Sequence, residues 1–454
     1  MRIHFIALGG SAMHNLAIAL RIKGYDISGS DDEIFEPSRG RLDKYGILPK
    51  EEGWDANRVD TSLDAVIVGM HAKNDNPELL KAKELGMKIF SFPEYLYEHA
   101  KNKTRVVIGG SHGKTTITSM ILHVMKHQDI PCDYMVGAQL EGFEVMVKLT
   151  DNAKIMILEG DEYLTSPLDL RPKFHIYLPD IALISGIAWD HINVFPTFEN
   201  YVWQFEKFAA LISKNGALIY FEDDKNVKTI CGASRKDIRK KPYGLPEYNI
   251  DSGVTSIFHN GEKIPLQIFG EHNLANMNGA RLICNELGVS DEDFYTAIQS
   301  FAGAGKRLEK LGENGHSTVF KDFAHSPSKL LATAKAVKNQ FPDRELVACM
   351  ELHTYSSLSE KFLSHYKGCM DDVDFPKVFF SPHALQLKRL EPITTEQVKD
   401  AFDNPKLQVY TDSKELLAGL LKTNWRDKNL LMMSSGNFDG VDLNLLAEKV
   451  LNNN

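Results

Sequence analysis

The stretch VVIGGSHGKTTITSM, at residues 106–120, constrains the fold more than any other part of this sequence. A β-branched apolar run leads into two glycines and a Gly-Lys-Thr, and an apolar segment of helical character follows directly. A strand, a glycine turn and a helix in this order belong to a parallel sheet with right-handed crossovers. Comparable alternation runs along the rest of the chain, so the sequence predicts an α/β fold.

The same stretch indicates a phosphate site. Gly109 and Gly110 allow the backbone to approach a phosphate closely, Lys114 adds a positive charge, and the Thr115 hydroxyl can join the shell of a magnesium ion. The strict form Gly-x4-Gly-Lys-[Ser/Thr] requires a glycine where this chain has Ile108. We therefore expect a phosphate-binding loop of a shortened kind.

The alternation falls into three stretches, as expected for 454 residues at about 100 to 200 residues per domain. Residues 1–103 open on the strand-like RIHFIALGG and end in a polar linker. Residues 104–308 contain the phosphate loop, and residues 309–454 alternate strands and helices again. We expect a Rossmann-like N-terminal domain, a P-loop ATPase-like central domain and a Rossmann-like C-terminal domain, with ligands beyond the carboxyl ends of the strands.

Composition argues against several classes of protein. A net charge of −9 disfavours a nucleic-acid-binding surface, and no apolar run approaches the roughly 18 residues of a membrane-spanning helix. The chain opens directly on a strand, which leaves no room for a secretory signal. Its five cysteines are scattered without Cys-x-x-Cys spacing, which fits reduced thiols. We expect a soluble cytoplasmic protein.

Acidic residues end two further apolar strands. Glu159, Asp161 and Glu162 lie in LEGDEYL, and Asp190 and His191 lie in GIAWDHINVF. Acids at a strand end are often merely solvated, and a lone histidine is more often structural than a ligand. After a phosphate loop, however, carboxylate oxygens are the ligands that magnesium requires, and the histidine follows a strand beside them.

The N-terminal turn LGGSAM gives a weaker indication. A dinucleotide fingerprint would need three glycines, but the aligned positions are Ala7, Gly9 and Ala12. The turn is either a plain strand-to-helix connection or a phosphate site at a helix N-terminus. Asp31, at the end of the second strand, could accept a hydrogen bond from a ribose hydroxyl.

Several polar residues later in the chain could face a nucleotide. Asn273 and Asn276 share a helical face, although asparagine at a helix start is commonly only a cap. Arg307 could clamp a phosphate, because a guanidinium binds phosphate oxygens in a fork. Asp322 and His325 lie between a strand and a helix.

Taken in order, these motifs resemble those of the Mur ligases, ATP-dependent amide-bond-forming enzymes of peptidoglycan metabolism. Residues 110–115 are similar to the family's shortened loop, residues 159–162 to its Glu-x-Asp-Glu and residues 190–191 to its Asp-His. Residues 272–276 are similar to its His-Asn-x-x-Asn, residues 307–309 to its Arg before a Glu, and residues 322–327 to its Asp-[Tyr/Phe]-[Ala/Gly]-His-x-Pro. The resemblance spans nearly the whole chain.

The resemblance implies a site residue by residue. The ATP-binding positions would be Gly110, Ser111, His112, Gly113, Lys114, Thr115, Thr116, Asn273, Asn276, Arg307, Asp322 and His325. The magnesium ligands would be Thr115, Glu159 and His191, and the catalytic residues would be Lys114, Glu159 and His191. The UDP part of a UDP-sugar would lie on Gly9, Gly10, Ser11, Ala12, Met13 and Asp31.

It also implies the reaction. A sugar carboxylate attacks the γ-phosphate of ATP, with charge on the phosphoryl oxygens neutralised by magnesium and Lys114, and an amine then attacks the resulting acyl phosphate. The amine must be neutral, and His353 is a candidate base. Ser326 and the segment ELHTYSS depart from the family pattern, because the segment lacks the arginines often found there.

Two branches of the family open on a strand and a similar glycine turn. One joins UDP-N-acetylmuramate to the tripeptide L-alanyl-γ-D-glutamyl-meso-diaminopimelate in peptidoglycan recycling, and the other joins it to L-alanine in biosynthesis. The start MRIHFIALGG, the tyrosine of EGDEY and the segment MMSSGNFDG favour the first branch. An NAD(P)-dependent oxidoreductase would leave Lys114, Glu159 and His191 without a role, and a non-catalytic regulator would bind ATP without turnover.

Overall fold

We describe a computed structural model of the chain, covering residues 1–454 except 138–142, 167–168, 190–193, 252, 306 and 453–454. The chain divides into two compact units, which we describe separately. Unit 1 comprises Met1–Gly244 and Asn276–Ala297, and unit 2 comprises Leu245–Ala275 and Ile298–Asn454. The domain boundaries at 103/104 and 308/309 stay a prediction.

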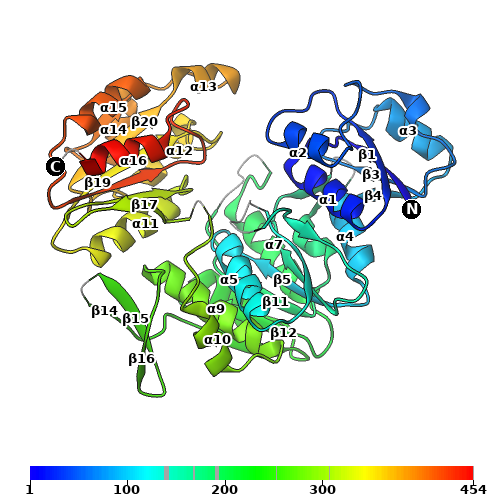
Figure 1. The fold of residues 1–454 in the computed structure, drawn as a ribbon, viewed down its shortest axis with the longest axis horizontal. Helices are drawn as coiled ribbons and strands as arrows, with labels where there is room; N and C mark the ends of the chain where they lie inside the picture. Colours follow the sequence, from blue (N-terminus) through cyan, green and yellow to red (C-terminus); the bar gives the residue numbers. More distant parts are fainter. Residues whose placement is uncertain (138–142, 167–168, 190–193, 252, 306, 453–454) are drawn as a thin grey trace. The chain divides into compact units, whose positions relative to one another are not determined.

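Unit 1 opens with a parallel sheet whose strand order is β2-β1-β3-β4 (Figure 1). The strands are β1 (Arg2–Ile6), β2 (Asp26–Ser30), β3 (Ala65–Val68) and β4 (Ile89–Ser91). The helices between and after them are α1 (Ser11–Ile22), α2 (Ser38–Lys44), η1 (Ala56–Arg58), α3 (Pro77–Glu84) and α4 (Phe92–Ala100). Every residue of β3 is buried, as expected for a strand of a parallel sheet with both faces covered.

The second sheet of unit 1 has the order β13-β12-β11-β5-β8-β6-β7 and is parallel except at β7. Its strands are β5 (Thr104–Gly109), β6 (Cys132–Met135), β7 (Val147–Lys148), β8 (Ile155–Glu159), β11 (Ile181–Ile184), β12 (Ala217–Phe221) and β13 (Arg239–Tyr243). Because β5 lies between β11 and β8, the ends of all three strands meet at one edge of the sheet.

Helices and a hairpin complete this part of unit 1. They are α5 (Lys114–His127), the hairpin β9 (Leu164–Ser166) and β10 (Asp169–Pro172), α6 (Lys173–Ile176), α7 (Phe198–Ala210) and α8 (Lys225–Ala233). Unit 1 also contains α9 (Glu271–Glu286) from Asn276 onward and α10 (Asp291–Ile298) through Ala297. Phe174, Phe205 and Phe208 are fully buried and stack or pack edge to face, which anchors α6 and α7 to each other.

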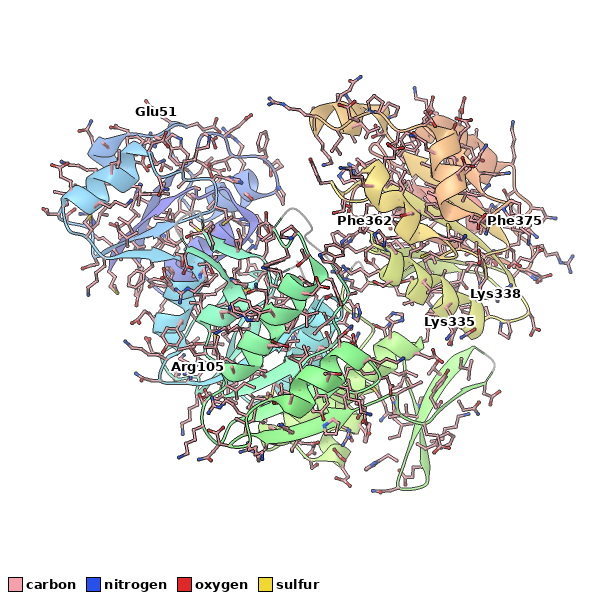
Figure 2. All side chains as sticks on the ribbon, turned by 180° about the vertical axis from the view of Figure 1, so that it is seen from behind. Glu51, Arg105, Lys335, Lys338, Phe362 and Phe375 are labelled. Atoms are coloured by element: carbon pink, nitrogen blue, oxygen red, sulfur yellow. The ribbon has the colours of Figure 1, made fainter. Side chains whose placement is uncertain are left out.

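A buried arginine of β5 binds backbone carbonyl groups that precede β5 and β11. Arg105, which is labelled in Figure 2, lies in β5. It donates hydrogen bonds to the carbonyl oxygens of Lys101, Lys103 and Leu178, at 3.0, 3.2 and 2.8 Å. Its guanidinium also forms an ion pair with Asp180, at 3.1 Å. The segment that the sequence predicts as a polar linker is therefore held in place by hydrogen bonds from the strand that follows it.

Unit 2 contains a sheet of order β17-β18-β22-β19-β20-β21, parallel except at β17. Its strands are β17 (Glu309–Glu313), β18 (Thr318–Asp322), β19 (Glu345–Leu352), β20 (Phe375–Phe380), β21 (Gln408–Tyr410) and β22 (Lys428–Met433). A separate antiparallel sheet contains β14 (Tyr248–Asp251), β15 (Val254–His259) and β16 (Glu262–Pro265).

The helices of unit 2 alternate along the chain with the strands of its larger sheet. They are α11 (Pro327–Gln340), α12 (Glu360–Leu363), η2 (Ser364–Tyr366), α13 (Pro382–Leu387), α14 (Thr395–Phe402), α15 (Ser413–Leu421) and α16 (Leu443–Asn452). Lys335 and Lys338 project from α11 (Figure 2). Lys335 forms an ion pair with Glu271, and Lys338 forms one with Asp374. A helix long and apolar enough to cross a bilayer is absent from the part of the chain that the structure describes.

Candidate active site

The predicted phosphate loop connects the central strand β5 to helix α5. Gly110 and Gly113 have φ values of +131° and +82°, in the region that favours glycine. A Cβ atom on Gly110 would lie 2.1 Å from the Ser185 hydroxyl, and one on Gly113 would lie 2.5 Å from Oδ1 of Asn276. Both glycines are therefore required by conformation and by space. The loop runs directly into the N-terminus of α5, where backbone N–H groups are available to an anion.

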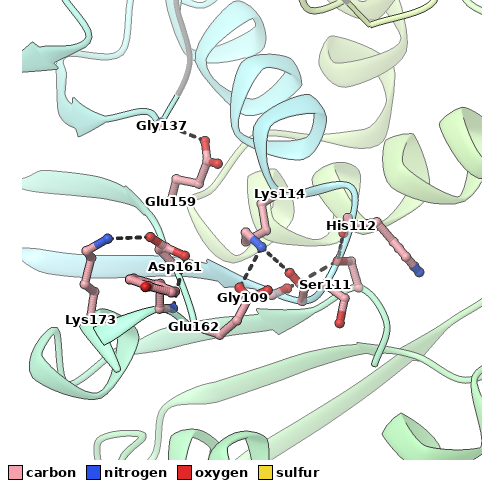
Figure 3. Close-up of polar contacts among 12 residues, drawn as sticks. Gly109, Ser111, His112, Lys114, Gly137, Glu159, Asp161, Glu162 and Lys173 are labelled. Carbon is pink, nitrogen blue, oxygen red and sulfur yellow. Dashed lines mark hydrogen bonds and ion pairs between the residues drawn. The ribbon is translucent and has the colours of Figure 1, made fainter. Parts of the chain in front are cut away.

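Lys114 opens α5 and is held by acidic groups (Figure 3). Its Nζ atom donates hydrogen bonds to the Gly110 carbonyl oxygen at 2.5 Å and to Oε2 of Glu162 at 2.7 Å. Burial disfavours the ammonium, but the nearby carboxylates of Glu162, Asp161 and Glu159 outweigh it and raise the pKa of Lys114. The lysine is therefore a cation at neutral pH, as phosphate binding requires.

Glu162 connects Lys114 to a tyrosine that the sequence did not indicate as a site residue. The hydroxyl of Tyr201, in α7, donates to Oε1 of Glu162 at 3.0 Å and lies 2.8 Å from the Ser111 hydroxyl. Glu162 is 1% exposed and Tyr201 is fully buried. A tyrosine among apolar positions of a helix is expected to belong to the core, so local pattern held no signal for this contact.

Thr115 and Glu159 supply oxygen atoms at the ends of neighbouring elements. The Thr115 hydroxyl donates to Oε1 of Glu159 at 2.9 Å. The Gly137 N–H donates to Oε2 of Glu159 at 2.9 Å, as Figure 3 shows. One carboxylate and one hydroxyl, with phosphate oxygens completing the shell, is a donor set that suits Mg²⁺. The residues present therefore fit the predicted ion.

The other predicted magnesium ligand, His191, lies outside the described residues, as does Asp190. Within the described ranges, no cluster of three or more histidine, cysteine, aspartate or glutamate side chains forms a ready metal site. Asp161, from the same acidic motif, pairs with Lys173 at 2.5 Å (Figure 3). In the structure Thr115 and Glu159 therefore contact each other, whereas Asp161 forms an ion pair with Lys173.

The segment after β11 supports the phosphate loop. The Ser185 hydroxyl donates to the His112 carbonyl oxygen, and the Ser111 N–H donates to the Gly186 carbonyl oxygen at 3.0 Å. The Ala188 N–H donates to the Ser111 hydroxyl oxygen at 2.9 Å. The loop is thereby fixed on both sides, by α5 and by the segment that leads toward residues 190–191.

The N-terminal turn is organised by Asp31. Its Oδ2 accepts a hydrogen bond from the Gly9 N–H at 2.7 Å, and its Oδ1 accepts one from the Asp32 N–H at 3.0 Å. Burial, with a contribution from Asp32, raises the pKa of Asp31 to about 6. In this structure Asp31 holds the turn itself, and its predicted contact with a ribose stays a prediction. Of the predicted UDP-binding positions, the partly or fully exposed ones are Gly9, Gly10, Ser11 and Ala12, and Met13 is buried.

The two asparagines of α9 have different surroundings. Oδ1 of Asn276 lies next to Gly113, at the phosphate loop. Asn273 is buried, and its Nδ2 atom donates to the Phe269 carbonyl oxygen at 2.9 Å. The structure therefore brings Asn276 to the loop, whereas the amide of Asn273 binds the backbone one turn earlier.

In unit 2, three predicted residues gather around Phe323. The Arg307 guanidinium carbon lies 4.7 Å from the centre of the Phe323 ring, and Nδ1 of His325 lies 2.8 Å from the Phe323 carbonyl oxygen. Asp322 accepts a hydrogen bond from the Leu308 N–H at 2.6 Å, next to Arg307. Phe323 was not predicted as a site residue, although it lies within the motif that was.

A second group of polar side chains lies at the ends of β19 and β22. Nδ1 of His353 is 3.5 Å from Oε1 of Glu351, which is 1% exposed. Glu351 also accepts from the Ser434 hydroxyl and, at 2.9 Å, from the Phe438 N–H. Burial acts against the charge of Glu351, but these donors lower its pKa. His353 is thus oriented by a carboxylate while about a third of its side chain stays exposed, at 36%.

Comparison with known proteins identifies the class. Residues 2–104 match the model described as "Mur ligase family, catalytic domain", and residues 108–284 match the model described as "Mur ligase middle domain". A UDP-N-acetylmuramate–L-alanyl-γ-D-glutamyl-meso-2,6-diaminoheptandioate ligase of Haemophilus influenzae is 27% identical over 457 residues, which cover 98% of each chain. A UDP-N-acetylmuramate–L-alanine ligase of Clostridium botulinum is 30% identical over 389 residues, 82% of this chain and 81% of that one.

A solved structure has the same fold. The crystal structure of a UDP-N-acetylmuramate–alanine ligase from Thermotoga maritima superposes with a TM-score of 0.70 at 19% identity, covering 100% of this chain and 98% of that one. The chain belongs to the Mur ligase family. The predicted α/β fold class and the prediction of an ATP-dependent ligase are confirmed.

Proposed function

We propose that this protein joins the carboxylate of UDP-N-acetylmuramate to the amine of L-alanyl-γ-D-glutamyl-meso-diaminopimelate, with ATP as the energy source, in peptidoglycan recycling. The observation that carries the proposal is the arrangement of Lys114, Thr115 and Glu159 at the carboxyl ends of adjacent strands. Similarity over 98% of the chain to a relative whose name states this tripeptide supports the choice of amine.

The phosphate loop and the N-terminal turn serve different substrates. The loop N–H groups and the Lys114 ammonium bind the phosphates and stabilise negative charge as the γ-phosphoryl group moves to the sugar carboxylate. Thr115 and Glu159, with His191 as the third predicted ligand, would hold Mg²⁺, which supplies further positive charge to the phosphoryl oxygens. Gly9 to Met13 would bind the UDP part through backbone N–H groups at the start of α1.

The second half of the reaction needs a neutral amine. His353 can accept the proton that the incoming ammonium must lose, and Glu351 can stabilise the imidazolium that forms. The amine then attacks the acyl phosphate, an amide bond forms, and inorganic phosphate leaves. A protein nucleophile is not required. A cytoplasmic location fits this proposal, because the substrates and the buried cysteine thiols belong to that compartment.

An L-alanine ligase of biosynthesis is the second candidate, supported by the 30% identity to the clostridial relative. The two are separated by measuring phosphate release from ATP with Mg²⁺ and UDP-N-acetylmuramate, with either L-alanine or the tripeptide as the amine. Turnover with the tripeptide and little with alanine supports the proposal. The reverse result assigns the protein to biosynthesis, and release with neither amine contradicts both.

A further inference from the structure

A continuous set of hydrogen bonds runs from the phosphate loop through α7 and back to Lys114. The Tyr201 hydroxyl donates its one proton to Glu162 at 3.0 Å, so at the 2.8 Å contact with Ser111 it is the serine that donates. Glu162 in turn accepts from Lys114 at 2.7 Å. Ser111 and Lys114, three residues apart in the loop, are therefore also connected through two side chains outside it.

Lys114 cannot keep its present partners unchanged and also bind phosphate fully. The proposed function requires its ammonium to turn toward the phosphates of ATP, which weakens its contact with Glu162 and with the Gly110 carbonyl oxygen. Glu162 is 1% exposed, so water cannot replace the lost donor readily. A buried carboxylate that loses a hydrogen-bond partner costs free energy. That cost opposes nucleotide binding unless another donor stays on the carboxylate.

We propose that Tyr201 is a positioning residue for nucleotide binding, acting through Glu162 on Lys114. Its hydroxyl keeps a hydrogen bond on Glu162 when Lys114 turns to the phosphates, which lowers the free energy of the nucleotide-bound state. The same hydroxyl accepts from Ser111 and holds the loop in its phosphate-binding form. The inference rests on the proposed function only in that the loop binds ATP.

The contribution of the Tyr201 hydroxyl can be measured separately from the packing of the Tyr201 ring. The ring is fully buried and packs against Phe195 and Phe205, with centroid distances of 5.5 and 5.3 Å. Replacement by phenylalanine keeps this packing and removes the oxygen atom alone. The chain also offers a matched control, Tyr177, which is fully buried and whose hydroxyl has no hydrogen-bond partner among the described residues.

The test is calorimetric titration of full-length protein with ATP, ADP and adenosine. We expect Tyr201→Phe to weaken ATP and ADP binding by about tenfold, the effect of one hydrogen bond to a charged group, and to leave adenosine binding within about twofold. Tyr177→Phe should leave all three unchanged. Equal weakening for adenosine would show a purely structural role and overturn the inference, as would unchanged ATP binding.

A double-mutant cycle adds a second readout. If Tyr201 acts through Glu162, Tyr201→Phe should have little further effect on ATP binding in a Glu162→Gln background, and additive losses contradict the relay. These titrations need no turnover. A wild-type protein that binds ATP but ligates neither amine would contradict the proposed function while the inference is still tested. A wild-type protein that binds no nucleotide overturns both.

Discussion

The Thr115 hydroxyl donates a hydrogen bond to Oε1 of Glu159 at 2.9 Å, joining the first turn of α5 to the last residue of the neighbouring strand β8. Two oxygen atoms suited to a cation therefore lie next to each other at the residue that follows Lys114 and at the end of β8. This pairing depends on the order of the sheet, in which β8 lies directly beside β5, and not on nearness in the sequence.

Replacing the carboxylate of Glu159 should weaken Mg²⁺ binding and slow the reaction. Glu159→Gln keeps the shape and the hydrogen bond from Thr115 but removes the negative charge that Mg²⁺ requires, so we expect kcat to fall by about 100-fold. Phosphate release measured over a range of Mg²⁺ concentrations checks this. Glu262→Gln, at an exposed position of β16, is the control and should behave as wild type. A Glu159→Gln enzyme with normal turnover and normal Mg²⁺ dependence would remove Glu159 from the metal site.

Alanine substitutions at two glycines with similar φ values distinguish the cost of backbone strain from the cost of a steric clash. A Cβ atom on Gly113 (φ +82°) would lie 2.5 Å from Asn276, whereas Gly24 (φ +91°) has open space around it. We expect Gly24→Ala to lower the free energy of unfolding by about 1 kcal/mol through backbone strain alone. Gly113→Ala should cost about 2 kcal/mol or more and also weaken ATP binding. Urea unfolding and nucleotide titration measure both, and equal costs would show that Asn276 yields freely.

The raised pKa of Asp31 predicts a pH dependence of stability. Its folded-state pKa, about 6, lies above the ordinary value of 3.8, so the folded protein binds a proton more tightly than the unfolded one. The free energy of unfolding should therefore fall as pH rises from about 4 to about 6, and this contribution should be constant above that window. Unfolding of wild type and Asp31→Asn across this range isolates the effect, and a constant difference between the two would contradict it.

His353 should act in the second half of the reaction only. We expect His353→Gln to lower kcat with the tripeptide by about 100-fold, because the ammonium loses its proton acceptor, while formation of the acyl phosphate continues. Trapping the acyl phosphate with hydroxylamine measures the first half separately. His316→Gln, at an exposed position outside this group, is the control. Loss of trapping together with turnover would show that His353 has a different role.

The parts of the site that follow one another along the chain were predictable from sequence. A strand, two glycines, Lys114 and a helix fix each other locally, and the structure has them as expected. The sequence predicts Asp31 at the end of the second strand, and Asp31 directly follows β2, which ends at Ser30. Its hydrogen bond with Gly9 depends on how two separate segments meet, which the local pattern does not indicate.

Contacts between segments that are far apart in the sequence could not be predicted from local sequence patterns. Tyr201 reaches Glu162 across 39 positions and Ser111 across 90, and both contacts depend on where α7 lies beside the sheet. The sequence gives no signal for Phe323 for a related reason, because the contact of its ring with the Arg307 guanidinium is visible only in the structure. A side chain that affects a site only by positioning another residue cannot be distinguished by sequence from an ordinary core residue.

Arg105 has a practical consequence for dissecting the protein into fragments. Its guanidinium takes three of its acceptors from the backbone just before β5, at Ala100, Lys101 and Lys103. A fragment that started at the predicted boundary, residue 104, would keep the arginine and lose all three carbonyl oxygens. An excised central domain should therefore begin upstream, with the end of α4 retained as part of the piece that is cut out.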